Sequence, residues 1–117
     1  MVNRRSSKGN GWTVDMQYKI RWLRQAGEDL QNIRQYLDQE APQQAQEIVG
    51  LIYDKTMALT SFPAGRGQRE PGKPEYRRLV ILNIYKVFYF IDEHEKTVEI
   101  RYIRHTSQGD TSDILEG

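Results

Sequence analysis

The sequence predicts an α+β protein in which one twisted sheet carries a helical hairpin on one face. Two consecutive segments place apolar residues at helical spacing, and three later segments are rich in alternating β-branched and aromatic residues. A short alternating segment before the helices adds a first strand, so the expected order is strand, helix, helix and a three-stranded antiparallel meander. The chain has 117 residues, of which 38% are hydrophobic, and this suits one domain with a single core.

The first strand and the first helix are predicted by two different periods. Apolar residues alternate over residues 16–22, the period of a half-buried strand: Met16, Tyr18, Ile20 and Trp22. Residues 24–40 carry an apolar stripe that marks one face of a helix: Ala26, Leu30, Ile33 and Leu37. Pro42 ends this helix, because proline cannot continue it, and also suits the first turn of the next one.

The second helix is expected to run from about Gln43 to Ser61 and to end before Phe62-Pro63. Its buried side is marked by four apolar residues at helical spacing: Ala45, Ile48, Ile52 and Leu59. The tight connection at Pro42 makes the two helices an antiparallel hairpin. We expect four of the apolar side chains to be buried together under the sheet: Leu30, Ile33, Ile48 and Ile52.

Residues 64–75 contain three glycines and two prolines and are predicted to form a loop. Strands are expected over 76–82, 84–91 and 97–105, with turns at Asn83 and at residues 92–96.

Alternation also predicts which side chains of these strands face the core. In the second of them we expect Phe88 and Phe90 to point inward, and Tyr85 and Tyr89 to be half exposed. In the last strand, one face should carry Val98, Ile100, Tyr102 and Arg104, and the other Glu99, Arg101, Ile103 and His105.

The folded domain is expected over residues 16–106. Residues 1–15 are polar and rich in glycine and serine, which predicts a disordered extension that the fold does not need. Residues 107–117 form an acidic tail with few core residues.

Several function classes are excluded on composition. Cysteine is absent and histidine occurs twice, so no metal centre is expected, and a reducing, cytoplasmic setting fits a chain without disulfides. No apolar run approaches the length of a membrane span, and no secretory signal precedes the first strand. Gly65-Arg66-Gly67 lies between a helix and a strand, the wrong context for a dinucleotide site, so no cofactor is expected.

Basic charge is concentrated in the middle of the chain. Residues 62–91 hold six basic and two acidic residues, although the net charge of the whole chain is only +1. The densest group is Arg66, Arg69, Lys73, Arg77 and Arg78. Such a group either binds an anionic partner or forms an ordinary solvated loop.

His105 ends the last strand beside Arg104. A histidine next to an arginine can act as a general acid or base in phosphodiester cleavage, with the arginine stabilising the developing charge. The alternative is a strand-end histidine that only makes hydrogen bonds at the surface.

Five stretches recur here in an order and spacing typical of one superfamily: Tyr18-Lys19-Ile20; Ala26, Asp29, Leu30 and Ile33 with Tyr36-Leu37; Phe62-Pro63 with Gly65-Arg66; Arg77 and Leu79 leading to Tyr85-Lys86-Val87-Phe88-Tyr89; and Val98-Glu99-Ile100 to Ile103-Arg104-His105. Over residues 16–105 the chain resembles RelE/ParE toxins of bacterial type II toxin–antitoxin pairs. The resemblance implies a twisted antiparallel sheet with a helical hairpin, and a small cognate antitoxin whose C-terminal segment wraps the toxin and fills its grooves.

Two activities divide this superfamily. ParE-like members poison DNA gyrase, whereas RelE-like members are ribosome-dependent endoribonucleases that cut mRNA. The long second helix and the Phe-Pro-x-Gly-Arg stretch resemble the ParE type, which makes gyrase inhibition the expected activity, without enzymatic chemistry of its own. In the RelE-like alternative, the resemblance implies Arg77, Arg104 and His105 as the catalytic group. A third alternative is a non-toxic relative that only binds an antitoxin.

Overall fold

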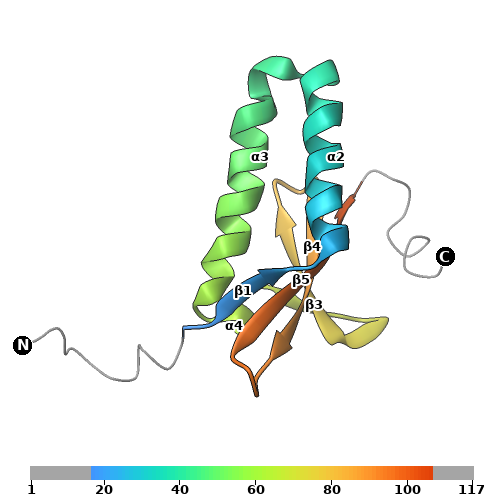
Figure 1. The fold of residues 1–117 in the computed structure, drawn as a ribbon. Helices are drawn as coiled ribbons and strands as arrows, with labels where there is room; N and C mark the ends of the chain where they lie inside the picture. Colours follow the sequence, from blue (N-terminus) through green and yellow to red (C-terminus); the bar gives the residue numbers. More distant parts are fainter. Residues whose placement is uncertain (1–16, 107–117) are drawn as a thin grey trace, which may run out of the picture.

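The computed structural model describes residues 17–106 and forms one open sheet with two long helices packed against it (Figure 1). The predicted extension 1–15, Met16 and the predicted tail 107–117 lie outside the described residues. Within that range no helix is long and apolar enough to cross a membrane.

The sheet has five strands in the order β1-β5-β4-β3-β2: β1 (Lys19–Trp22), β2 (Gln68–Glu70), β3 (Lys73–Ile81), β4 (Tyr85–Asp92) and β5 (Thr97–His105). The last three strands form the predicted antiparallel meander, and β2 adds a short antiparallel edge to it. At the opposite edge, β1 pairs with β5 in parallel. The α+β fold with one sheet and a helical hairpin is therefore confirmed.

The helical hairpin consists of α2 (Arg24–Glu40) and α3 (Pro42–Met57), and α2 has the predicted bounds. The second helix is shorter than predicted, because the chain continues as a 3₁₀ turn over Ala58–Thr60. Here the backbone N–H of Tyr18 donates to the carbonyl oxygen of Thr60 at 2.7 Å. This bond ties the end of the hairpin to the start of β1 and prevents a longer α-helix.

The prediction of a loop over residues 64–75 is wrong. The segment contains most of a four-residue helix, α4 (Pro63–Arg66), then β2 and the first residues of β3. Phe62 enters α4 with a left-handed backbone, at φ 52°. The side-chain Nε of Arg66 donates to the carbonyl oxygen of Ser61 at 2.6 Å and closes this turn. Elements of three or four residues are too short to show a period, so glycine and proline dominated the prediction.

The core lies between the sheet and the hairpin and is made of buried side chains from both layers: Ala26, Ile52, Leu59, Ile81, Tyr85, Val87, Tyr89, Val98, Ile100 and Ile103. Of the four side chains expected to be buried together, only Ile52 is fully buried. Leu30, Ile33 and Ile48 are half-buried and pack against the core. Figure 1 shows why: the far end of the hairpin extends beyond the sheet, so part of its inner side faces no strand.

A β-bulge overturns the predicted alternation of the last strand. Phe88 pairs with Tyr102 but Tyr89 pairs with Ile100, which leaves Arg101 as an extra residue on β5. Beyond the bulge the faces exchange, so Ile103 joins Ile100 in the core and Tyr102 turns to the opposite face.

The predicted burial of β4 is right for Phe88, which is fully buried, and wrong for the other three aromatic residues. Tyr85 and Tyr89 are fully buried on the side of the hairpin, and Phe90 is only half-buried on the other side. The Tyr89 hydroxyl donates a 2.6 Å hydrogen bond to the carbonyl oxygen of Pro63, which satisfies its polar end inside the core. Burial raises the pKa of Tyr89 to about 12.

Candidate functional site

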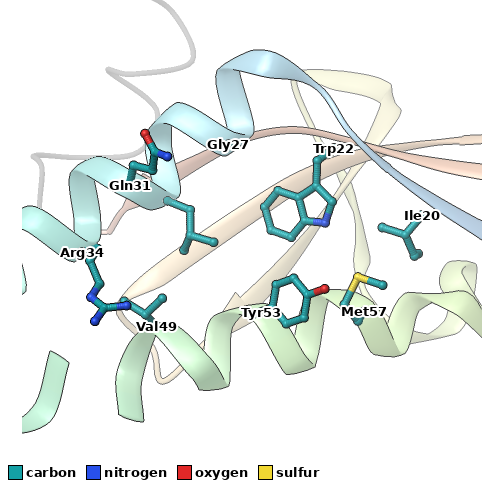
Figure 2. Close-up of a pocket in the computed structure, with 9 residues that line it drawn as sticks. Ile20, Trp22, Gly27, Gln31, Arg34, Val49, Tyr53 and Met57 are labelled. Carbon is teal, nitrogen blue, oxygen red and sulfur yellow. The ribbon is translucent and has the colours of Figure 1, made fainter. Parts of the chain in front are cut away.

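A groove of about 530 Å³ lies between α2, α3 and β1 (Figure 2). Its lining is mostly apolar and comes from all three elements: Ile20, Trp22, Gly27, Leu30, Gln31, Arg34, Val49, Tyr53 and Met57. Figure 2 shows Ile20 and Met57 at one end and Arg34 and Val49 at the other. The sheet does not fill the space between the two helices here, so apolar side chains remain open to a partner.

Two aromatic rings form the middle of the groove. Trp22 and Tyr53 stack with their centroids 6.0 Å apart and their planes 10° from parallel. Tyr53 is 47% exposed, so almost half of this aromatic side chain is open to a partner. The indole Nε1 of Trp22 is buried and has no hydrogen-bond partner among the described residues.

Gly27 leaves the α2 wall of this groove without a side chain. A Cβ added there would meet no atom within 4 Å, so its side chain would enter open space. The basic side chains of β1, Lys19 and Arg21, alternate with the groove-lining Ile20 and Trp22 and so point away from the groove, and Arg21 pairs with Glu99 at 3.6 Å. The charged residue that lines the groove is Arg34, at one of its ends (Figure 2). An apolar groove with an arginine at one end fits an amphipathic segment that carries an acidic residue at that end.

The face of the sheet opposite the hairpin carries a second cluster, which we call the arginine–aromatic ladder: Tyr76, Phe88, Phe90, Arg101, Tyr102 and Arg104. Phe88 is fully buried beneath the other five, which are half-buried. Phe88 and Tyr102 stack with centroids 4.7 Å apart, and Tyr76 meets Tyr102 edge-on at 6.5 Å. The Arg101 guanidinium carbon lies 5.3 Å from the Tyr76 ring centroid, and that of Arg104 lies 4.5 Å from the Tyr102 centroid. Each distance is within the range of a cation–π contact.

Ion pairs hold the arginines of this face in place. Arg101 pairs with Glu99 at 3.1 Å, and Arg78 pairs with the buried Glu70 at 3.0 Å. The Nε atoms of Arg78 and Arg101 are nevertheless buried and lack a partner within residues 17–106. Burial also raises the pKa of Tyr102, and the nearby charge of Arg104 opposes that rise.

The predicted basic group is distributed rather than gathered into one patch. Arg66, Arg69 and Arg77 each donate to a backbone carbonyl oxygen, those of Ser61, Pro74 and Ala64 respectively. Arg78 is on the ladder side, held by Glu70, whereas Arg77 pairs with Tyr89 in the β3–β4 register. Lys73 lies 5.9 Å from the Tyr76 ring centroid. These side chains therefore stabilise the local structure around β2 and β3 and also give this region its positive charge.

Arg104 and His105 lie together, beside α2. Arg104 Nη1 is 3.3 Å from Asp29 Oδ2, and the His105 ring meets Tyr85 edge-on at 5.1 Å. Both residues line a hollow of about 310 Å³ that Asp29 and Ile33 also line. Arg77 is remote from them, because it pairs with Tyr89 while His105 pairs with Tyr85. Four residues separate these positions, about 13 Å along a strand.

The groove was not recognised from the sequence, although two signals for it were present. Val49, Tyr53 and Met57 recur at intervals of four, which predicts a second apolar stripe on α3 beside the buried one. Gly27 interrupts the matching side of α2. The ladder had no such signal, because the bulge at Arg101 brings Tyr102 to that face. In residues 17–106 no three histidine or acidic side chains gather as a metal site would require.

Comparison with known proteins gives a consistent result. The family model of the ParE toxin of the type II toxin–antitoxin system parDE matches residues 20–109. A chain of the chromosomal ParDE system from P. aeruginosa superimposes with a TM-score of 0.67 and 20% identity, covering 78% of this chain and 97% of that one. A chain of the RelBE2 toxin–antitoxin complex from Mycobacterium tuberculosis gives 0.58 and 20%, covering 76% and 98%. No curated protein sequence matches.

Proposed function

The chain belongs to the ParE toxin family of type II toxin–antitoxin systems, and we propose that it arrests growth by trapping DNA gyrase until a cognate antitoxin binds it. Toxin–antitoxin membership follows from the family match over residues 20–109. Gyrase as the target, and the surfaces used for target and antitoxin, are the parts that we propose.

One observation supports gyrase trapping over RNA cleavage: of the candidate catalytic residues, Arg77 lies away from Arg104 and His105, and each of the three makes contacts within the fold. Arg104 is tied to Asp29, His105 packs against Tyr85, and Arg77 binds the Ala64 carbonyl oxygen. General acid–base catalysis needs its groups within hydrogen-bond reach of one reacting centre. A protein that traps its target needs only a contact surface.

The arginine–aromatic ladder is a suitable contact surface for a protein target. Arginine and tyrosine are enriched among residues that dominate protein–protein binding energy. Arg101 is held by Glu99 and flanked by the rings of Tyr76 and Phe90, so little side-chain entropy is lost when a partner docks. We assign the target to this face.

The antitoxin is assigned to the groove between α2, α3 and β1. Its apolar lining and Arg34 at one end match a short amphipathic segment with an acidic residue. The groove and the ladder lie on opposite sides of the sheet. An antitoxin bound in the groove would therefore neutralise the toxin in one of two ways. It would sterically block the approach to gyrase, or it would extend around the edge of the sheet and cover the ladder.

The RelE-like alternative has one observation in its favour: Arg104 and His105 line the same hollow. Expression in cells separates the two activities. Gyrase trapping predicts growth arrest with induction of the DNA-damage response, and rescue by co-expression of the antitoxin encoded beside the chain. Arrest with cleaved mRNA and no DNA-damage response would instead establish the nuclease, and absence of arrest would leave only antitoxin binding.

A further inference from the structure

We propose that the indole N–H of Trp22 is a recognition element of the groove, which donates a hydrogen bond to an oxygen acceptor on the bound antitoxin segment. This inference rests on the proposed role of the groove as the antitoxin site. It adds one hydrogen bond to the apolar contacts through which the groove would bind the antitoxin.

The unused donor is the first step. Trp22 is the last residue of β1, and its ring is fixed by the stack on Tyr53. Its Nε1 is buried without an acceptor among the described residues. A buried donor that lost its water and gained no acceptor destabilises the free protein, and tryptophan N–H groups usually find a partner when buried. In the free chain this donor is therefore unsatisfied, and an acceptor on a bound segment would supply the missing hydrogen bond.

Access to this donor is the second step. Figure 2 shows the indole nitrogen turned toward the side on which Tyr53 and Met57 lie. Met57 is an unbranched side chain with several rotatable bonds, which readily adapts to a bound surface. Tyr53 is 47% exposed and carries a hydroxyl for which no hydrogen bond is formed within the described range. A modest rearrangement of Met57 would open the N–H to the groove.

The chemistry of the acceptor is the third step. Backbone carbonyls inside a helix already accept hydrogen bonds from their own helix. If the antitoxin segment is helical, its acceptor must be a side-chain oxygen of Asn, Gln, Asp or Glu, or a carbonyl of its last turn. The expected ligand is thus an amphipathic segment with apolar residues toward Leu30, an acidic residue toward Arg34, and one oxygen acceptor at Trp22.

The direct test is a ¹H–¹⁵N spectrum of the full chain in a Trp12→Phe background, where the indole resonance belongs to Trp22 alone. The purified antitoxin encoded beside the chain serves as the probe. We expect the Trp22 indole proton to move downfield and its exchange with solvent to slow when the complex forms. A Trp22→Phe variant should bind the antitoxin about three- to tenfold more weakly, the effect of one neutral hydrogen bond.

A matched pair of glycine variants separates failure of this inference from failure of the groove assignment. Gly27 and Gly50 both lie inside helices with nothing within 4 Å of an added Cβ, but only Gly27 lines the groove. Gly27→Leu should weaken antitoxin binding at least tenfold, and Gly50→Leu should not. Suppose that Gly27→Leu blocks binding, but that the Trp22 indole resonance of the Trp12→Phe protein does not move when the antitoxin binds. The Trp22 inference is then overturned and the groove assignment stands. If both glycine variants bind the antitoxin normally, the groove assignment and the Trp22 inference are both overturned.

Discussion

Asp29 Oδ2 accepts a 2.9 Å hydrogen bond from the backbone N–H of Ile103, which joins the first helix to the last strand. The parallel pairing of β1 with β5 ends at Ile100, so on the β1 side of β5 the N–H of Ile103 has no strand partner, although Ile103 pairs with Val87 of β4 on the other side. The same oxygen pairs with Arg104 at 3.3 Å, and Oδ1 accepts from Gln25 Nε2 at 2.8 Å. The Asp29 carboxylate thus accepts the β5 hydrogen bond that β1 would have accepted if it were longer.

Asp29→Ala should therefore lower the free energy of unfolding by about 1–3 kcal/mol, because it strands a part-buried N–H and the Arg104 charge. Urea denaturation measures this value. Asp38→Ala is the control, since its ion pair with Arg34 is exposed and should contribute no more than about 1 kcal/mol. Equal effects of the two substitutions would show that Asp29 acts only through surface charge.

Gly67→Ala should be destabilising by about 1–3 kcal/mol. An added Cβ would collide with the Tyr89 hydroxyl and with the backbone carbonyl oxygen of Arg78, and the backbone atom cannot rotate away. Gly65→Ala, two residues earlier, meets nothing within 4 Å and should be nearly neutral. The difference in thermal midpoint between these two variants tests the close approach of α4 to the sheet.

Tyr89 should make the fold sensitive to alkaline pH. Its pKa is raised from 10.0 to about 12 by burial, so the unfolded state loses this proton first as the pH rises. Its contribution to stability is fully present below pH 10 and is lost between about pH 10 and 12, at about 1.4 kcal/mol per pH unit. Tyr89→Phe should be less stable at neutral pH, because Pro63 loses its donor, but should show a shallower decline above pH 10. Parallel curves for the two proteins would refute the buried hydroxyl.

His105→Ala should still arrest growth, because gyrase trapping requires no proton transfer by the toxin. The variant must first be shown to be folded and to bind the antitoxin. Loss of arrest in such a variant, together with mRNA cleavage by the parent chain, would support the RelE-like mechanism, in which general acid–base catalysis is typically worth about 10²–10⁴ in rate.

Long periodic segments carried most of the information about the fold. The stripe from Ala26 to Leu37 predicted α2 with its observed bounds, and the alternation over Thr97–His105 predicted β5. Short elements and the bulge at Arg101 depend on tertiary contacts, such as the Tyr89–Pro63 bond, that leave no period in the sequence. For the same reason the basic residues could be identified, but not their distribution over two faces of the sheet.

Supercoiling of relaxed plasmid by purified gyrase tests whether this toxin acts on gyrase through the arginine–aromatic ladder, as we propose. The chain should inhibit supercoiling, and its antitoxin should reverse the inhibition. Tyr76→Ala, on the ladder, should weaken inhibition at least tenfold, whereas Tyr36→Ala, an exposed tyrosine of α2, should not. Unimpaired supercoiling at saturating toxin, with cleavage of ribosome-bound mRNA by the same preparation, would show that the toxin is a RelE-like nuclease and not a gyrase inhibitor.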